Sequence, residues 1–163
     1  QYRFHPMFKW VEEWCNDEFA HGEAFALLMK SDPKLTRGVN VWWIKFFLTA
    51  VYATMYVRDH QRPAFHEALG VDTDWYAHEV FTKTSKLSEQ IFPITLDIDN
   101  PRWDAGLKRL QKANVDLADA KKQGRKVAQL GASIRAGLAF VGLFTIPPKK
   151  HAVPAKTRLE PAY

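Results

Sequence analysis

The chain has 163 residues, of which 47% are hydrophobic and 13% aromatic, so it is long and apolar enough for one domain with a core and is not a disordered protein. Its one cysteine, Cys15, excludes an internal disulfide and a cysteine-based zinc site. The net charge of +5 divides into an acidic first hundred residues and a basic remainder, and because no nucleic-acid-binding motif accompanies the basic part, no nucleic-acid partner is expected.

The first predicted element is a helix that begins at Pro6 and ends at Ser31, before Asp32 and Pro33. Proline suits a first helical turn because its missing N–H group is not needed there. One side of this helix carries mostly apolar residues at helical spacing, which predicts that this side is buried. Its members are Met7, Val11, Trp14, Cys15, Glu18, Gly22, Phe25 and Met29.

Five further helical segments are expected, because helical periodicity continues and period-two alternation is almost absent. Pro63 and Gly70 bound a short one, Asp72 caps the next, and Asn100 with Pro101 starts another. The expected ranges are residues 41–57, 64–70, 72–90, 102–123 and 127–148, with residues 94–101, "ITLDIDNP", as a connector and an extended tail after 148.

Two of these segments, residues 39–57 and 127–148, approach the roughly 20 residues that cross a bilayer. Asn40 and Lys45 interrupt the first and Arg135 interrupts the second, so interfacial or protein-buried helices are expected rather than spans. Basic pairs bracket the second segment, which favours contact with an anionic membrane surface or a membrane protein. These residues are Arg125, Lys126, Lys149 and Lys150.

The predicted fold class is all-α. We expect residues 1–125 to form a helical domain, and residues 126–163 to add an apolar, basic-flanked helix and a tail, either in the same domain or as a docking appendage. Because the chain starts at Gln1 rather than at a methionine, it is interpreted as a processed or partial chain.

Glu18 and His21 lie three residues apart and therefore share one side of the first helix. An inward-pointing Glu-x-x-His pair is one unit of the di-iron site of ferritin-like carboxylate proteins, in which carboxylates bridge the irons and histidine leaves positions open for dioxygen. A surface ion pair or a hydrogen-bonded histidine is the alternative interpretation. A complete site needs a second such pair and two more glutamates, and the sequence has no second Glu-x-x-His.

The string "FKWVEEWCNDEFAHGEAFALLMKSDPKL" resembles the second Asp-Glu-x-x-His segment of the aerobic magnesium-protoporphyrin IX monomethyl ester oxidative cyclase family of photosynthetic organisms. The strings "FFLTAVYATMYVRDHQRPAFHEALG", "IFPITLDIDNPRW" and "PPKKHAVPAKTRLEPAY" extend the resemblance over nearly the whole chain.

The resemblance implies a ferritin-like half-bundle and an oxygen-dependent, di-iron enzyme of chlorophyll and bacteriochlorophyll synthesis. This enzyme would close the fifth ring of a magnesium porphyrin to give divinyl protochlorophyllide, with electrons from NADPH or reduced ferredoxin. Glu18 and His21 match the family's iron-ligand pair, and Asp17 matches the acid before it. An auxiliary cyclase subunit is an expected partner. The expected location is peripheral, on the cytoplasmic face of a bacterial photosynthetic membrane or on a chloroplast membrane.

Two departures from the family pattern bear on the site. Ala20 stands where the family usually has an arginine, so a guanidinium that could support the metal ligands is absent. The family's first Asp-Glu-x-x-His segment and both lone glutamates would lie upstream of Gln1. The chain is therefore expected to hold one of four ligand-bearing helices and to need a missing N-terminal half for two irons.

Other candidate residues have both functional and structural interpretations. Asp59, His60, His66 and Glu67 cluster around Pro63 and form either a polar patch near the substrate or an ion-paired helix end, with Asp59 bonded to Arg58 or Arg62. The structural interpretation is favoured. A run of aromatic residues either lines a flat tetrapyrrole pocket or belongs to the core, which is again favoured; its members are Trp42, Trp43, Phe46, Phe47, Tyr52 and Tyr56.

The leading hypothesis is oxidative ring closure by a membrane-bound di-iron enzyme to which this chain contributes one Glu-x-x-His arm. The rival hypothesis is a non-catalytic helical subunit or docking module of a photosynthetic membrane complex that retains the C-terminal half of the cyclase.

Overall fold

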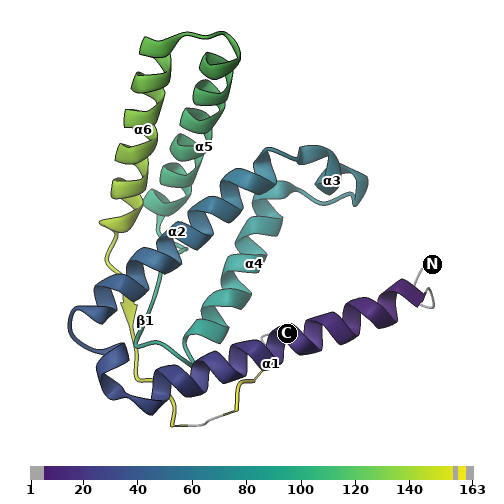
Figure 1. Ribbon diagram of the computed structural model, residues 1–163, viewed down its shortest axis with the longest axis vertical. Coiled ribbons are helices and arrows are strands. Elements are labelled where there is room, and N and C mark those ends of the chain that lie inside the picture. The colour runs from purple at the N-terminus through teal and green to yellow at the C-terminus, as the bar shows by residue number, and fades with distance from the viewer. Residues whose placement is uncertain (1–5, 156–157, 161–163) are drawn as a thin grey trace.

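The computed structural model describes residues 6–155 and 158–160, and within them the all-α prediction is confirmed (Figure 1). The helices are α1 (Pro6–Ser31), the 3-10 helix η1 (Pro33–Thr36), α2 (Asn40–His60), α3 (Pro63–Ala68), α4 (Thr73–Ser88), α5 (Pro101–Lys122) and α6 (Lys126–Phe144). Two short strands, β1 (Ile94–Thr95) and β2 (Lys149–Lys150), complete the described structure.

The helix boundaries follow the capping residues of the sequence. The side chain of Asp72 accepts a hydrogen bond from the backbone N–H of Trp75 at 2.8 Å and starts α4. Asn100 accepts from Arg102 N at 3.0 Å, and Pro101 is the first residue of α5. After α5, Gly124 has a φ of 67°, the left-handed conformation that favours glycine and lets the chain reverse into α6.

The main core lies where α2, α4, α5 and α6 meet. The rings of Tyr52 and Phe81 stack with centroids 4.5 Å apart. Helices α5 and α6 form an antiparallel hairpin (Figure 1), and Gly106 of α5 lets Leu143 of α6 approach closely. The buried members are Tyr52, Ala53, Tyr56, Ala77, Phe81, Leu96, Ile98, Trp103, Leu107, Leu110, Ala139, Leu143 and Ile146. The residues after 125 thus supply part of this core.

The strand pair lies in segments that the sequence indicated as connector and tail. Strands β1 and β2 are antiparallel, with Ile94 opposite Lys150 and Thr95 opposite Lys149. A pairing of two residues each shows no alternation in sequence and depends on the packing of the flanking helices. Because neighbouring side chains of a strand point to opposite sides, Lys149 and Lys150 face different surroundings.

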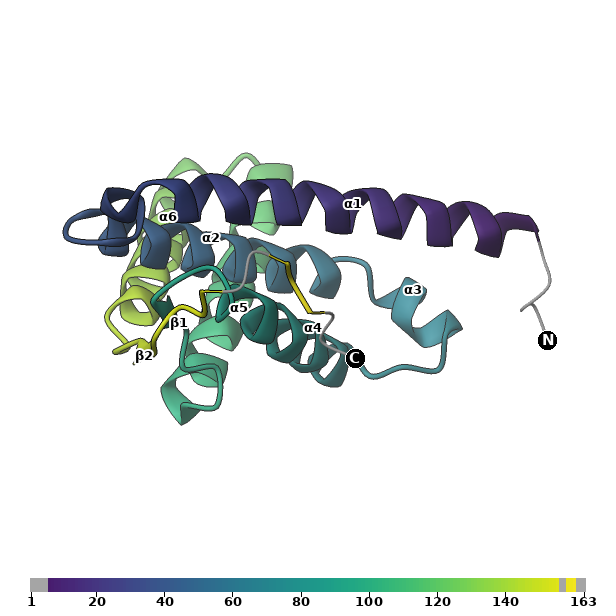
Figure 2. The same ribbon diagram turned by 90° about the horizontal axis from the view of Figure 1, so that it is seen from below.

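Helix α1 is held mainly through its C-terminal half and extends past the other helices toward the N-terminus (Figure 2). Ala26 of α1 packs with Ile91 and Leu159 in a second, smaller core. Glu23 accepts a hydrogen bond from Leu159 N at 3.1 Å. Partly buried members of this second core are Phe19, Met29 and Phe92.

The predicted burial of one side of α1 is therefore wrong for most of its length. Trp14, Cys15, Glu18 and Phe25 are exposed. The buried side of the helix is centred on Ala26, about a quarter of a turn or more away from Trp14, Glu18 and Phe25. Of the predicted apolar side, Phe25 contacts the Phe92 ring and Met29 packs in the second core, whereas Trp14 and Glu18 stay exposed.

Candidate functional site

The Glu-x-x-His pair lies on the uncovered side of α1. The Glu18 Oε2 and His21 Nδ1 atoms are 3.8 Å apart, and the two side chains are 58% and 78% exposed. The prediction that both face the helical core is thus wrong for this chain. The spacing prediction holds, because one helical turn brings the carboxylate and the imidazole side by side.

The surface around the pair is strongly apolar. Five large apolar side chains on α1 are between 49% and 65% exposed: Met7, Trp10, Trp14, Phe25 and Leu28. Together with Glu18 and His21 they follow one another at steps of three or four residues, which places all of them on one side of the helix. We call this surface the α1 stripe. An exposed apolar surface of this kind marks an interaction site rather than an ordinary solvated face.

The α1 stripe supplies two metal-ligand donors. Carboxylate oxygen and imidazole nitrogen are both ligands that iron accepts. Among the described residues, no group of three or more His, Cys, Asp or Glu side chains could hold a metal ion. Asp17 and Ala20 are exposed beside the pair. The donor chemistry therefore fits one arm of an iron site, and the remaining donors would have to come from another segment.

A polar network joins the end of α2 to α4 and α5. Tyr56 donates a hydrogen bond to Asp74 Oδ1 at 2.7 Å, and His60 Nε2 lies 3.0 Å from the same oxygen. His60 Nδ1 lies 2.8 Å from the Tyr56 carbonyl, so both ring nitrogens face acceptors. Partial burial opposes ionisation of Asp74, but the bonds from Tyr56 and His60 and the charge of Lys108 lower its pKa overall.

Among the residues around Pro63, Asp59 forms the ion pair that the structural interpretation expected. Arg58 Nη2 lies 3.2 Å from Asp59 Oδ1, so Asp59 is part of an ion-paired helix end. His66 is buried on α3, with its ring centroid 4.8 Å from that of Tyr76. No contact in the described part of the chain joins Asp59 or His60 to the Glu18–His21 pair.

The aromatic run of α2 does not line a single pocket. Tyr52 and Tyr56 belong to the main core, as the structural interpretation predicted. Trp42, Trp43 and Phe47 are 63%, 55% and 60% exposed at the other end of the helix. They form an exposed group with three further rings, which we call the aromatic cluster: Trp42, Trp43, Phe46, Phe47, Phe140 and Phe144.

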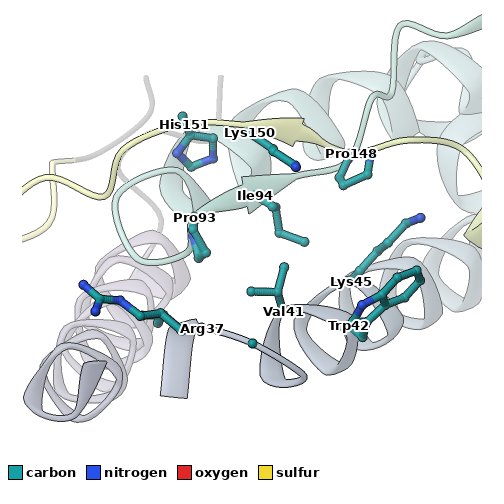
Figure 3. Close-up of a pocket in the computed structure, with 11 residues that line it drawn as sticks. Arg37, Val41, Trp42, Lys45, Pro93, Ile94, Pro148, Lys150 and His151 are labelled. Atoms are coloured by element: carbon teal, nitrogen blue, oxygen red, sulfur yellow. The ribbon is translucent and has the colours of Figure 1, made fainter. Parts of the chain in front are cut away.

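A pocket that the sequence did not reveal lies between the start of α2 and the strand pair (Figure 3). Its volume is about 600 Å³. Val41 and Ile94 point toward one another across it, and Lys150 projects from β2 (Figure 3). The full lining is Thr36, Arg37, Gly38, Val41, Trp42, Lys45, Pro93, Ile94, Pro148, Lys150 and His151. The one sequence signal was Lys45, the only charge within residues 41–57.

Helix α6 is the one helix of the described residues that is long and apolar enough to cross a membrane, by length and composition. Its side opposite α5 is exposed, with Val127, Leu130, Ile134, Leu138 and Val141 at helical spacing. We call this side the α6 stripe. Arg125 and Lys126 lie at the start of α6, whereas Lys149 and Lys150 lie beyond its other end in β2.

The fold and the α1 pair define an all-α protein that presents one Glu-x-x-His arm of the kind found in di-iron carboxylate proteins. Comparison with known proteins gives the particular relatives. The chain is 49% identical to an aerobic magnesium-protoporphyrin IX monomethyl ester oxidative cyclase from Rubrivivax gelatinosus, over 99% of this chain and 46% of the relative. The predicted resemblance to the C-terminal part of these cyclases is confirmed.

Two further relatives carry the magnesium-protoporphyrin IX monomethyl ester oxidative cyclase name. The magnesium-protoporphyrin IX monomethyl ester oxidative cyclase of Synechococcus elongatus is 40% identical over 91% of this chain and 43% of its own length. The Porphyra purpurea protein of the same name is 41% identical over 76% of this chain and 36% of its own length. The chain thus spans less than half the length of these curated relatives. No family model and no solved structure matches it.

Proposed function

We propose that this chain is the C-terminal part of an oxygen-dependent, di-iron oxidative cyclase that acts on magnesium-protoporphyrin IX monomethyl ester. The observation that carries the proposal is the position of Glu18 and His21 in the middle of the exposed α1 stripe. Similarity over 99% of the chain to a protein named for this activity supports it.

The proposed reaction oxidises the methyl-esterified propionate side chain and closes the fifth ring, giving divinyl protochlorophyllide. Dioxygen is the oxidant, and NADPH or reduced ferredoxin supplies the electrons. Bound iron would supply the activation of dioxygen. Glu18 would hold iron through a carboxylate oxygen and His21 through an imidazole nitrogen.

The rest of the iron site would come from the additional length that the relatives carry before the matched part. That N-terminal part would pack on the α1 stripe and bury Trp10, Trp14 and Phe25, which are exposed in this chain. Burial of these side chains would also exclude water from the pair, so that its carboxylate is held in a drier environment than the exposed helix provides.

The protein is proposed to lie on a membrane rather than to cross it. The apolar α6 stripe fits the acyl boundary of a bilayer, and the flanking basic residues fit an anionic surface. Helix α5, however, packs along α6 and carries Lys108, Arg109, Lys112 and Asp116. Because α5 is charged, the α5–α6 hairpin is favoured at the membrane–water interface, where α5 stays in water, over a position across the bilayer.

The test is the iron content and product yield of the full-length protein, that is, this chain together with the N-terminal part found in its relatives. Glu18→Ala and His21→Ala should each remove most of the iron and abolish ring closure. The helix should persist, because alanine is the best helix former. Glu12→Ala, on the opposite side of α1, is the matched control and should retain both iron and activity. Normal iron and product yield in His21→Ala would contradict the proposal.

A further inference from the structure

We infer that the pocket between the start of α2 and the strand pair binds the anionic head group of a membrane lipid. The inference deepens the membrane association proposed above by assigning it a specific site. Arg37, Lys45 and Lys150 all line the pocket, and its lining contains no Asp or Glu.

The three cations have no carboxylate partner among the described residues. The neighbouring Lys149 provides the contrast, because its Nζ lies 3.1 Å from Asp97 Oδ1 and 2.8 Å from Asp99 Oδ2. Because side chains alternate along β2, Lys149 lies on the side of the ion pairs and Lys150 lies on the side of the pocket. An uncompensated group of cations around an apolar pocket is stabilised by a bound anion.

Lys45 is the least solvated of these cations. The residue is only 6% exposed, and its Nζ lies 4.7 Å from the centroid of the Phe144 ring and 5.8 Å from that of Trp42. Cation–π contacts stabilise an ammonium less than an opposite charge does in such surroundings. Burial accordingly lowers the pKa of the Lys45 ammonium.

His151 adds an unused polar atom to the same pocket. Its backbone N–H donates to the Pro93 carbonyl at 3.1 Å and fixes the residue beside β1. Its Nε2 atom is buried and has no hydrogen-bond partner in the part of the chain that the structure describes. In the tautomer that carries its hydrogen on Nε2, this atom can donate to a phosphate oxygen, which would satisfy it.

The surroundings favour a lipid over a free anion. Trp42 lines the pocket and also belongs to the aromatic cluster, so the pocket opens beside exposed Trp43 and Phe47. Tryptophan is enriched at the level of lipid head groups. Phe140 and Phe144 connect this cluster to α6, whose exposed stripe would rest on the same leaflet.

The reacting porphyrin is a less suitable occupant. His21 lies ten residues before the end of α1, a helical rise of about 15 Å, and η1 follows before the pocket is reached. The pocket lining includes no residue of α1, so a molecule seated between α2 and the strand pair would not contact the proposed iron ligands from within the pocket. We assign the pocket to anchoring and not to the reaction.

The experiment measures binding of soluble dihexanoyl phosphatidylglycerol to the 163-residue chain by calorimetry, so that it does not depend on membrane association. Lys150→Gln should weaken binding about tenfold, as expected for loss of a charge-assisted contact. Arg37→Gln should weaken it similarly. Lys149→Gln is the matched control and should leave it unchanged, because that lysine is engaged by Asp97 and Asp99.

Three results would overturn the inference. Equal effects of Lys150→Gln and Lys149→Gln would show that general charge, and not the pocket, attracts the lipid. Inorganic phosphate binding as tightly as phosphatidylglycerol would show a free-anion site. Binding of protoporphyrin IX without binding of the lipid would assign the pocket to a porphyrin carboxylate. If the soluble lipid binds as expected but the chain does not bind vesicles, the assignment of the pocket to a lipid head group is supported and the proposed membrane association is wrong.

Discussion

Helices α1 and α6 both present an exposed apolar stripe, but they differ in the charges around it. Helix α1 carries Glu12, Glu13, Asp17, Glu18 and Glu23, whereas α6 contains no acidic residue and has basic residues at its start and beyond its end. Acidic groups around α1 fit a metal and a protein partner but would be repelled by an anionic membrane. The basic surroundings of α6 fit that membrane. The charges around the two stripes therefore assign the α1 stripe to a protein partner and the α6 stripe to a membrane.

The largest expected effect is a loss of vesicle binding when the α6 stripe, but not the α1 stripe, is made polar. Leu130→Gln combined with Leu138→Gln should weaken binding to phosphatidylglycerol vesicles by about 3 kcal/mol, or roughly a hundredfold, because two leucines lose their burial in the acyl region. Both residues are exposed in the chain alone, so its thermal stability should change little. Vesicle co-sedimentation and thermal unfolding measure the two quantities.

The matched variant lies on α1. Trp10→Gln combined with Trp14→Gln should leave vesicle binding unchanged but abolish association with the N-terminal part of the full-length protein. If the α1 variant lost vesicle binding as fully as the α6 variant, the assignment of the two stripes to different partners would be wrong.

A second expected effect is a difference in the cost of adding a methyl group to α5 and to α1, because α5 is packed more tightly. A Cβ atom added at Gly106 would lie 2.6 Å from Leu143 Cδ2, and Leu143 is only 1% exposed and cannot move aside. Gly106→Ala should therefore destabilise the chain by about 1–3 kcal/mol despite the better helix propensity of alanine. At Gly22 of α1 the nearest such atom, in Leu159, is 3.9 Å away.

Gly22→Ala is consequently the control for packing. It should stabilise the chain by roughly 0.5–1 kcal/mol, as alanine does in an unobstructed helix. Urea unfolding of both variants gives the two free energies. Destabilisation by Gly22→Ala equal to that by Gly106→Ala would mean that α1 is held as tightly as the α5–α6 hairpin.

The sequence predicted the helix boundaries well because local chemistry determines them. Pro6, Asp72, Asn100 and Gly124 mark helix ends through backbone constraints and side-chain caps, which need no knowledge of the tertiary fold. The prediction that α1 buries its apolar side failed for a different reason. Periodicity identifies an apolar side but does not say which segment covers it, and the described segments leave most of the α1 stripe exposed.

The pocket was missed because it is assembled from distant segments. Arg37, Lys45 and Lys150 come from the loop after η1, from α2 and from β2, and the pairing of β1 with β2 brings Lys150 to the other two. That pairing involves two residues in each strand and has no sequence signature. The Glu18–His21 spacing, by contrast, was visible because both donors lie within one turn of one helix.

The smallest predicted effect is a pH dependence from the α2–α4–α5 network. The pKa of Asp74 is lowered below its ordinary value of 3.8, so its bonds to Tyr56 and His60 stabilise the fold fully above that value. This contribution is lost as the pH falls through the lowered pKa. Asp74→Asn should flatten the dependence of the unfolding free energy on pH below about 4, and Tyr56→Phe should flatten it less. An unchanged acid limb in Asp74→Asn would exclude this carboxylate as a source of the dependence.

The most direct test of the central claim is hydroxyl-radical footprinting of the tryptophans in this chain and in the full-length protein. Trp10 and Trp14 on the α1 stripe are 64% and 53% exposed in the chain, and Trp75 on α4, at 59%, is an internal reference. Trp10 and Trp14 should become protected in the full-length protein without vesicles, while Trp75 stays reactive and Trp42 and Trp43 become protected only when anionic vesicles are added. Undiminished reactivity of Trp10 and Trp14 in the full-length protein would contradict the claim that α1 presents its Glu-x-x-His pair to the N-terminal part.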